Sequence, residues 1–249
     1  MKAIQYVALA LAIWGTIPRA GAQGPLAPPG APAPLMKTLG EIEPRTPIAT
    51  VPYTITQPGT YYLVSNLTSA TDGVIIRTND VVLDLMGFAL AGDRSSSGDI
   101  GVYVEGTNAA PILDVVVRNG TIHDFGYGVR MDHGRAGRLE GLDVASNAYG
   151  GIWLYGRFGK CSGNAIRDCA VHDNGQVGIY LNGTSSGTCH GNAVSGCTVA
   201  GNGSMGVLLT TSGSGACNDN TVENCVVDGN VDSGIHLVYA RGTRVEGNH

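Results

Sequence analysis

The sequence predicts an all-β solenoid, and three observations support that prediction. A pattern of glycine, an apolar residue, a variable residue and a second apolar residue occurs seven times from Gly73 onward, mostly at intervals of about 28 residues. Each copy alternates with the period of two that is typical of strands. Glycine supplies 38 of the 249 residues, about twice its usual share, which suits frequent tight turns. We therefore predict a right-handed parallel β-helix with about seven coils of about 28 residues.

The segment 1–22 has the pattern of a secretory signal peptide. Lys2 provides the positive start, an apolar run extends from Val7 to Ile17, and small residues precede a cleavage site after Ala22. The apolar run is shorter than the roughly 20 residues that a membrane span requires, so we expect no span in the mature chain. The protein is expected to be secreted, or to reside in the periplasm or on the cell surface.

The rest of the chain divides into three parts. Residues 23–34 are rich in proline and alanine and predict an extended linker. Residues 35–72 are expected to form an N-terminal cap with the first strands, and residues 73–249 the repeats. By the phase of the repeat Asn248 corresponds to Asn220. The repeats are therefore expected to stop within a coil, truncated before its next strand.

The recurring strand defines the register between coils. In each copy the residue after the glycine and the residue two positions later point inward, whereas the intervening positions point outward. Inward residues of successive coils are therefore expected to form one buried stack. Its predicted members are Val102, Val129, Ile152, Ile179, Val207 and Ile235.

A second strand recurs between copies of the first, and its last three copies superpose residue by residue. Asn164, Asn192 and Asn220 occupy the same position in these three copies. Equivalent positions of neighbouring coils lie about 4.8 Å apart, so these residues predict an asparagine ladder. Asparagine suits turns because its amide bonds to the backbone and because it tolerates left-handed conformations. We interpret this ladder as structural.

Six cysteines recur in the same phase, two in each of three coils, with the same spacing within each coil. Export to an oxidising compartment favours disulfides, and pairing within a coil explains why a coil has either two cysteines or none. Two stacks of buried thiols and bridges between stacked neighbours are the alternatives, and the spacing does not fit a zinc site. The predicted pairs are Cys161/Cys169, Cys189/Cys197 and Cys217/Cys225.

The repeats and the residues before them resemble a known family. The segments MKTLGEIEPRTPI, YTITQPGTYYLVSNLT and VVLDLMGFALAG precede coils with the pattern Cys-x-(Gly/Asp)-Asn-x-aliphatic-x-x-Cys-x-Val. These segments are similar to those of bacterial secreted right-handed β-helix repeat proteins, which share the fold of pectate lyases. The resemblance extends from Leu35 to the C-terminus. It implies the fold and a capped N-terminal coil from Tyr53 to Leu67, and it specifies no activity.

The charge balance makes one class of partner improbable. The chain has 15 basic and 20 acidic residues, a formal net charge of -5 and no basic cluster, which argues against nucleic acid. The negative charge also disfavours a strongly polyanionic substrate unless calcium bridges it. The sequence has no calcium-loop motif. We predict no cofactor and no metal site, and Ca²⁺ is the one alternative that the sequence leaves open.

The outward positions of the recurring strand predict a binding face. Aromatic rings stack on pyranose rings, while arginine, carboxylate and amide groups bind hydroxyl groups, so this mixture is typical of sugar-binding grooves. The alternative is an ordinary solvent-exposed sheet, in which tyrosine and tryptophan are simply good strand formers. The predicted polysaccharide-binding residues are Tyr103, Trp153, Tyr155, Tyr180, Asn182 and His236.

Four candidate catalytic residues lie on or beside this face. A lyase acting on uronic acids needs a base and a group that neutralises the carboxylate, and hydrolysis needs two carboxylates at a defined separation. Glu105 and Asp132 fall on adjacent coils, with Arg130 and His133 close by. The Asp-Asp pair of polygalacturonases and the Trp-x-Asp-His segment of many pectate lyases are both missing from the sequence.

Two functions therefore follow from the sequence. The first is binding of an extracellular polysaccharide along the outward face, with cleavage or epimerisation if the protein is a lyase, a glycoside hydrolase or an epimerase. The second is a non-catalytic surface or adhesion protein whose coils form a rigid scaffold. Charged side chains that converge favour the first function, and a flat face without a pocket favours the second.

Overall fold

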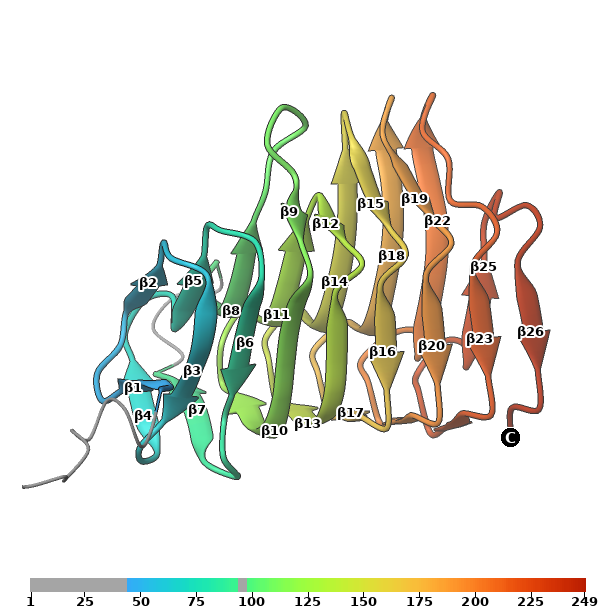
Figure 1. Ribbon diagram of the computed structural model, residues 1–249. Helices are drawn as coiled ribbons and strands as arrows, with labels where there is room; N and C mark the ends of the chain where they lie inside the picture. The colour runs from blue at the N-terminus through green and yellow to red at the C-terminus, as the bar shows by residue number, and fades with distance from the viewer. Residues whose placement is uncertain (1–43, 94–97) are drawn as a thin grey trace, which may run out of the picture. The chain divides into compact units, whose positions relative to one another are not determined.

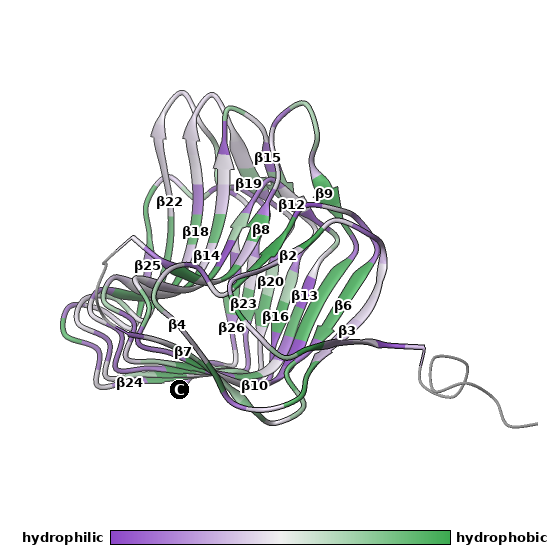
Figure 2. Ribbon diagram, turned by 90° about the vertical axis from the view of Figure 1, so that its left-hand side faces the viewer, coloured by the Kyte–Doolittle hydropathy of each residue, from purple (hydrophilic) through white to green (hydrophobic). Residues whose placement is uncertain are grey.

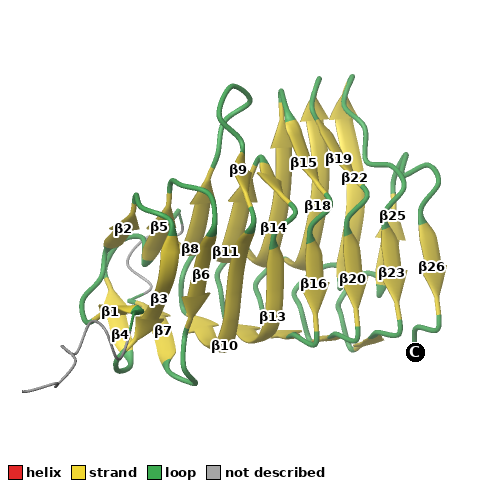
Figure 3. Cartoon of the chain, viewed as in Figure 1, coloured by secondary structure: helices red, strands yellow, loops and turns green. Residues whose placement is uncertain are grey.

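The computed structural model describes residues 44–93 and 98–249, which contain strands and turns and no helix (Figures 1 and 3). In this part of the chain, therefore, no helix is available that is long and apolar enough to span a membrane. The predicted signal peptide (residues 1–22), the predicted linker (residues 23–34) and the first part of the predicted cap lie outside the described residues. The described strands pair in parallel and stack coil upon coil around one core (Figure 2).

An eight-stranded parallel sheet contains the recurring glycine pattern, and its strands follow one another in chain order. Seven of the eight strands are those that the repeat predicts, and the additional one, β2, comes from the predicted cap. Every neighbouring pair is parallel, as stacked coils require. The strands are β2 (Tyr53–Ile55), β5 (Val74–Ile76), β8 (Ile100–Glu105), β11 (Tyr127–Asp132), β14 (Gly150–Arg157), β18 (Val177–Ser185), β22 (Val207–Gly213) and β25 (Ile235–Leu237).

The remaining strands form a 14-stranded sheet and a four-stranded sheet. The larger sheet comprises β1 (Thr46–Ile48), β3 (Gly59–Leu63), β4 (Leu67–Ser69), β6 (Val81–Asp84), β7 (Ala89–Gly92), β10 (Val115–His123), β13 (Arg138–Ala145), β16 (Ala165–Arg167), β17 (Ala170–His172), β20 (Ala193–Ser195), β21 (Thr198–Ala200), β23 (Thr221–Glu223), β24 (Val226–Asp228) and β26 (Arg244–Glu246). The smaller sheet comprises β9 (Ile112–Leu113), β12 (Gly134–Arg135), β15 (Lys160–Ser162) and β19 (Thr188–His190).

The predicted stack of inward-pointing aliphatic residues is confirmed. Cα pairing in the eight-stranded sheet joins its six members in the predicted order, from Val102 to Ile235. The first five are fully buried, and Ile235, in the last coil, is partly buried against the core. The register of the outward face therefore follows the repeat as well.

Close packing explains why glycine begins each copy of the repeat. A Cβ atom on Gly151 would lie 2.4 Å from Val171 Cγ1 and 2.6 Å from the carbonyl oxygen of Gly178. Both distances are shorter than van der Waals contact, so a side chain at this position would push the coils apart. The recurrence of glycine is thus a packing requirement that the sequence displays directly.

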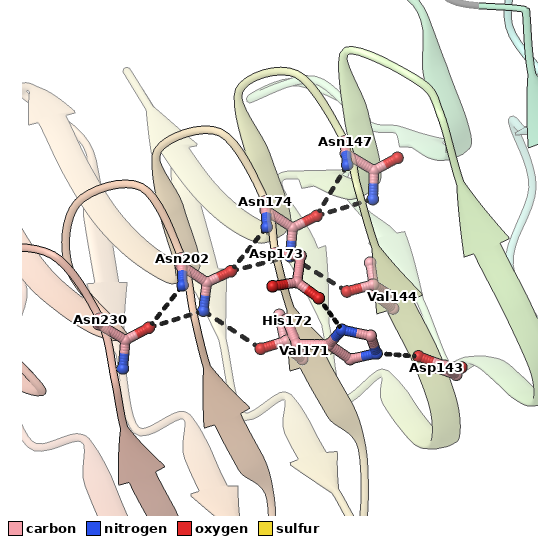
Figure 4. Close-up of polar contacts among 9 residues, drawn as sticks. All are labelled: Asp143, Val144, Asn147, Val171, His172, Asp173, Asn174, Asn202 and Asn230. Carbon is pink, nitrogen blue, oxygen red and sulfur yellow. Dashed lines mark hydrogen bonds and ion pairs between the residues drawn. The ribbon is translucent and has the colours of Figure 1, made fainter.

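The predicted asparagine ladder is confirmed, and the structure contains a second one (Figure 4). In the first ladder, the backbone N and Nδ2 of Asn164 donate to Asn192 Oδ1 at 3.0 and 2.9 Å. The second ladder repeats this pattern, with Asn174 donating to Asn202 Oδ1 at 3.1 and 3.0 Å. Each buried side chain thus satisfies polar groups of the adjacent coil, as buried amides require. The members of the second ladder are Asn147, Asn174, Asn202 and Asn230.

The prediction of disulfides within each coil is wrong, because the structure has six free, buried cysteines. Cys161 lies on β15 of the four-stranded sheet, whereas Cys169 follows β16 of the 14-stranded sheet, so the two do not meet. The thiol of each cysteine instead contacts its equivalent in the neighbouring coil, as for Cys161 and Cys189. The alternative of two stacks of buried thiols describes the structure; they are Cys161, Cys189 and Cys217, and Cys169, Cys197 and Cys225.

The predicted correspondence of Asn248 with Asn220 is also wrong. Strand β26 pairs with β23 so that Arg244 lies opposite Thr221, and Thr243 therefore takes the position that follows Asn220 along the axis. Asn248 Oδ1 instead accepts a hydrogen bond from the backbone N of Cys225 at 2.9 Å. The phase of the repeat fails here because the segment from the start of β25 to the start of β26 is shorter than the matching segment from β22 to β23, so the strand expected to be missing is present as β26.

His172 lies on the outer surface of β17 between two carboxylates (Figure 4). Its Nδ1 is 2.8 Å from Asp173 Oδ2 and its Nε2 is 3.0 Å from Asp143 Oδ1. The hydrogen bond with Asp173, together with the charge of Asp143, raises the pKa of His172 above its ordinary value of 6.5. The imidazolium is therefore favoured in the folded state.

We expect His172 to make folding stability depend on pH. Because its pKa is raised on folding, its contribution is fully present below pH 6.5 and is lost as the pH rises through the folded-state pKa. Between about pH 6 and about pH 8 the wild type should lose more stability than His172→Gln. The measurement is urea unfolding at both pH values. His190→Gln is the control, since that ring contacts the Thr188 hydroxyl and forms no ion pair with a carboxylate of the described residues. Equal pH slopes for wild type and His172→Gln would refute the expectation.

Candidate functional site

The predicted binding and catalytic residues of β8, β11, β14 and β18 lie on one outer face of the eight-stranded sheet. One row along the helix axis joins Tyr103, Arg130, Trp153 and Tyr180, and the next row joins Glu105, Asp132, Tyr155 and Asn182. His236 lies further along, because Leu208 separates it from Tyr180 in the same row. His133 follows β11 in the turn that leads to β12. The part of these two rows that lies on β8, β11, β14 and β18 therefore forms the core of the candidate site.

Arg130 and Asp132 form a bidentate ion pair at the centre of this face. Arg130 Nε donates to Asp132 Oδ1 at 2.8 Å, and Nη2 donates to Oδ2 at 2.9 Å. The Tyr103 hydroxyl donates to the same Oδ2 at 2.9 Å. Both carboxylate oxygens are thus hydrogen-bonded, and the bidentate geometry holds the guanidinium in one orientation.

Three aromatic rings surround the Arg130 guanidinium. Its Cζ lies 5.3 Å from the ring centroid of Tyr155, 5.7 Å from that of Tyr103 and 6.0 Å from that of Tyr127. These distances are within the range of cation–π attraction. The rings and the carboxylate together fix the guanidinium before any ligand arrives.

The environment keeps these groups in their ordinary charge states at neutral pH. Burial, reinforced by the Asp132 carboxylate, raises the pKa of Tyr103 well above its ordinary value of 10.0. Burial alone would lower the pKa of Arg130, but its hydrogen bonds with Asp132 outweigh that effect and raise it. Tyr103 is therefore a neutral hydrogen-bond donor and Arg130 a permanent cation.

Glu105 is paired away from this cluster. Its Oε2 accepts a hydrogen bond from Arg77 Nε at 2.5 Å, across the coil boundary between β5 and β8. The two carboxylates of the face are therefore each neutralised by a separate arginine. This arrangement differs from that of a hydrolase, in which one carboxyl group is free to act as an acid and the other as a base or nucleophile.

His133 joins two loops. It has a left-handed backbone with φ of 56°, and its side chain is buried. Its Nδ1 lies 3.1 Å from the carbonyl oxygen of Gly106, and its Nε2 lies 2.6 Å from that of Arg157. Both ring nitrogens thus face backbone carbonyls of the loops on either side. We interpret His133 as a positioning residue that holds these loops together.

The turn that contains His133 forms the floor of a hollow of about 470 Å³, which we call the notch. In each coil a connection leads from a strand of the eight-stranded sheet to a strand of the four-stranded sheet. His133 alone makes this connection between β11 and β12, whereas the two neighbouring coils use residues 106–111 and residues 158–159. The longer connections rise as walls beside the shorter turn. The notch is lined by Asn108, Arg130, Asp132, His133, Tyr155, Arg157 and Phe158.

The notch has a surplus of positive charge. Asp132 neutralises Arg130, whereas Arg157 has no ion-pair partner among the residues that the structure describes. The guanidinium of Arg157 lies 5.2 Å from the ring centroid of Phe158, and that ring is half exposed. Two arginines and two aromatic rings, those of Tyr155 and Phe158, thus border the space where a ligand would bind.

The aromatic row beside the notch packs against itself. Trp153 meets Tyr127 edge to face at 4.7 Å and Tyr180 at 4.6 Å between ring centroids. The indole also lies over Gly150, where a Cβ atom would be 2.1 Å from Nε1, and this buried Nε1 has no hydrogen-bond partner. Trp153 therefore supports its neighbours and offers less free ring surface than a flat row of platforms would.

Tyr180 and Asn182 end the site on the next coil. Burial, together with the nearby Tyr155, raises the pKa of Tyr180 to about 12, so its hydroxyl stays protonated. Asn182 Nδ2 donates to that hydroxyl, whereas Asn182 Oδ1 is buried without a partner. Because Asn182 Oδ1 is buried, this acceptor is not open to a ligand on the outer face.

Sequence reasoning missed Asn108, Tyr127, Arg157 and Phe158. Three of these four lie in or beside turns, whose length and direction the strand pattern does not predict. A signal for the notch was nevertheless present, because the interval from Gly128 to Gly151 is the shortest between successive repeat glycines. A coil shortened by several residues must lack part of one turn, and the missing part leaves the gap that becomes the notch.

No metal site was found in the part of the chain that the structure describes. Across residues 44–93 and 98–249, no three histidine, cysteine, aspartate or glutamate side chains converge closely enough to hold a metal ion.

Comparison with known proteins identifies the fold. The sequence matches the family described as "right handed beta helix region" over residues 65–216 and 100–249, and no curated protein matches it. ORF18 of Geobacillus virus E2 is 15% identical, with a TM-score of 0.53, over 78% of this chain and 45% of its own. The A-module of mannuronan C-5 epimerase AlgE4 from Azotobacter vinelandii is 15% identical, with a TM-score of 0.42, over 82% of this chain and 76% of its own. Pectate lyase Pel9A is 16% identical, with a TM-score of 0.36, over 70% of this chain and 54% of its own. The chain thus spans less than half of the viral protein, and these identities concern the fold alone.

Proposed function

The chain belongs to the right-handed β-helix family, and from that premise we propose that it is an exported protein that binds an extracellular polysaccharide. The binding surface is the outer face of the eight-stranded sheet, with the notch at its centre. Export rests on the signal-peptide pattern of residues 1–22. The observation that supports binding is the notch itself, in which two arginines and two aromatic rings border one hollow.

A polysaccharide suits this face for geometric reasons. The rows of side chains run along the helix axis with a repeat of about 4.8 Å, so an extended polymer lying along this axis meets new polar or aromatic side chains at each coil. The Tyr155 and Phe158 rings offer apolar surfaces for sugar rings, and Arg130 and Arg157 offer donors for hydroxyl or acidic groups. The side chains thus provide the two kinds of contact that sugar recognition uses.

The same geometry favours binding over cleavage. A general base needs a free acceptor within reach of the substrate, but both oxygens of Asp132 accept hydrogen bonds already. Glu105 is paired with Arg77, and the nitrogens of His133 face carbonyl groups. Arg130 and Asp132 therefore hold each other, Arg77 holds Glu105, and His133 holds the loops in place. The protein is best described as a binding scaffold.

We expect Tyr155→Ala to weaken polysaccharide binding by about 10-fold or more, because the ring both borders the notch and packs on Arg130. The measurement is affinity electrophoresis against polygalacturonate, alginate, xylan and dextran, followed by calorimetry with the polymer that binds most tightly. Product formation is assayed in parallel.

Tyr62→Ala is the matched control, because Tyr62 lies on β3 of the 14-stranded sheet and stacks on Arg45. It should leave affinity unchanged. The proposal fails if none of the polymers binds, or if Tyr155→Ala and Tyr62→Ala weaken binding equally. Turnover by the wild type would instead show that the face is an active site.

A further inference from the structure

The last coil repeats part of the sequence pattern of the coil that contains the notch. Residues 128–141 read GVRMDHGRAGRLEG, and residues 234–247 read GIHLVYARGTRVEG. Both segments share their first and last glycines and the glutamate, and Arg135 and Arg138 match Arg241 and Arg244, whereas His236 takes the position of Arg130. Each segment belongs to a shortened coil. In the last coil, Val245 lies opposite Val222, and fewer residues separate these two than separate Val222 from Val194, its partner in the preceding coil.

The two segments also share their backbone conformation. Tyr239 occupies the position of His133, and the two have φ angles of 54° and 56°. The next left-handed positions coincide as well, at Ala136 and Gly242, with φ angles of 54° and 62°. The same sequence pattern thus builds the same tight turn twice, four coils apart.

The repeated turn lies beside a second hollow. The segment from the start of β22 to the start of β23 is longer than the segment from the start of β25 to the start of β26, and a space of about 560 Å³ lies between them. We call this space the C-terminal hollow. Its lining includes Thr211, Ser212, Ala216, Asn218, Tyr239 and Arg241.

The side chains of this hollow are those of a binding site for a polar ligand. The Tyr239 ring is 80% exposed, so it presents a free aromatic surface. The backbone of Arg241 is held on both sides, because its N donates to Asn218 Oδ1 at 3.1 Å and its O accepts from Asp219 N at 2.8 Å. The Arg241 side chain is exposed and forms no ion pair with a described residue. Among the described residues, no carboxylate lines the hollow.

We propose that the C-terminal hollow is a second saccharide subsite, which engages the same polymer chain as the notch. The inference rests on the proposed function, because it takes the polysaccharide as the ligand. A sugar ring would stack on Tyr239, while Arg241, Ser212 and Asn218 bind its polar substituents. The subsite and the notch lie at the same edge of the coils, four coil spacings or about 19 Å apart.

Two subsites on one rigid rod predict a dependence on ligand length. An oligosaccharide long enough to reach both hollows gains a second contact at high effective concentration, whereas a shorter one contacts a single hollow. Affinity should therefore rise steeply once the oligosaccharide spans about 19 Å. The rigid stack of coils keeps this distance fixed, which makes the threshold sharp.

The experiment uses size-fractionated oligosaccharides of whichever panel polymer binds most tightly, titrated into the full chain. Tyr239→Ala and Arg241→Ala should each lower the affinity for long oligosaccharides by about 10-fold and leave that for short ones unchanged. Tyr155→Ala, in the notch, should weaken binding of both lengths. Melting temperatures confirm that the variants are folded, as expected for exposed residues.

The outcomes separate this inference from the proposed function. If Tyr155→Ala weakens binding while both C-terminal variants bind long oligosaccharides like the wild type, the second subsite is refuted and the notch stands. If the wild type binds no oligosaccharide of any length, both proposals are overturned. If short and long oligosaccharides bind the wild type equally, the two hollows do not share a polymer.

Discussion

Asn192→Ala is expected to lower the free energy of unfolding by about 3 to 5 kcal/mol, because it leaves buried polar groups without partners. The Asn192 side chain is buried in the middle of its ladder. Its Oδ1 accepts from the backbone N and the Nδ2 of Asn164, and its Nδ2 donates to Asn220 Oδ1 at 3.1 Å and to the Cys161 carbonyl at 3.2 Å. Alanine satisfies none of these groups.

Urea unfolding of the wild type and the variant measures this effect. Asn66→Ala is the matched control, since Asn66 is exposed and accepts one hydrogen bond, from the backbone N of Ala89 at 2.9 Å. Its loss should cost about 1 kcal/mol or less. Equal destabilisation by the two substitutions would show that the ladder contributes no more than a surface turn.

Asp132→Ala is expected to weaken polysaccharide binding by about 30-fold and to cost about 2 kcal/mol of stability. The substitution removes three hydrogen bonds at once and leaves Arg130 without its partner. Breaking a fully buried ion pair costs about 3 to 5 kcal/mol, and the partial exposure of Arg130 reduces that figure. Binding falls although the notch becomes more positive, because the guanidinium is no longer held in position.

Two further variants separate orientation from charge. Asp132→Asn keeps an acceptor for the Tyr103 hydroxyl and should fall between wild type and Asp132→Ala in both measurements. Glu105→Ala removes the other carboxylate of the face, which pairs with Arg77 outside the notch, and should change affinity less than about three-fold. If Asp132→Ala instead binds as well as the wild type, or better, net charge and not the positioned guanidinium governs recognition.

The repeat predicted the eight-stranded sheet well because its determinants are local. A glycine at one phase has to accommodate the next coil, as at Gly151, and the period of two decides which side chains face the core. Once the register between coils is known, neighbours along the axis follow, so Arg130, Trp153 and Tyr180 share one row. The asparagine ladder followed from the same argument.

The sequence predicted connections between coils less well. The disulfide prediction was wrong because spacing along the chain does not reveal that Cys161 and Cys169 belong to different sheets. The prediction for Asn248 was wrong because it assumed that the last coil has the same length as the coils before it, whereas this coil is shorter. Turn lengths vary without affecting the buried stack, so the periodic signal does not constrain them.

The candidate site depends both on the strand repeat, which the sequence displays, and on side-chain conformations and turns, which it does not. Tyr103, Arg130, Asp132 and Tyr155 lie on the predicted face, and the strand pattern was enough to bring them together. Their hydrogen bonds were not predictable, because whether Asp132 is a free base or an anchor for Arg130 depends on side-chain conformation. The walls of the notch depend on turns, so their residues emerged only from the structure.

The most direct test of polysaccharide binding at the notch is a crystal structure of the protein with a bound oligosaccharide of the panel polymer that binds most tightly. We expect a sugar ring against Tyr155 or Phe158 and a sugar oxygen within hydrogen-bonding distance of the guanidinium of Arg130 or Arg157. A saccharide bound to the outer surface of the 14-stranded sheet, with the notch occupied by water alone, would contradict the account.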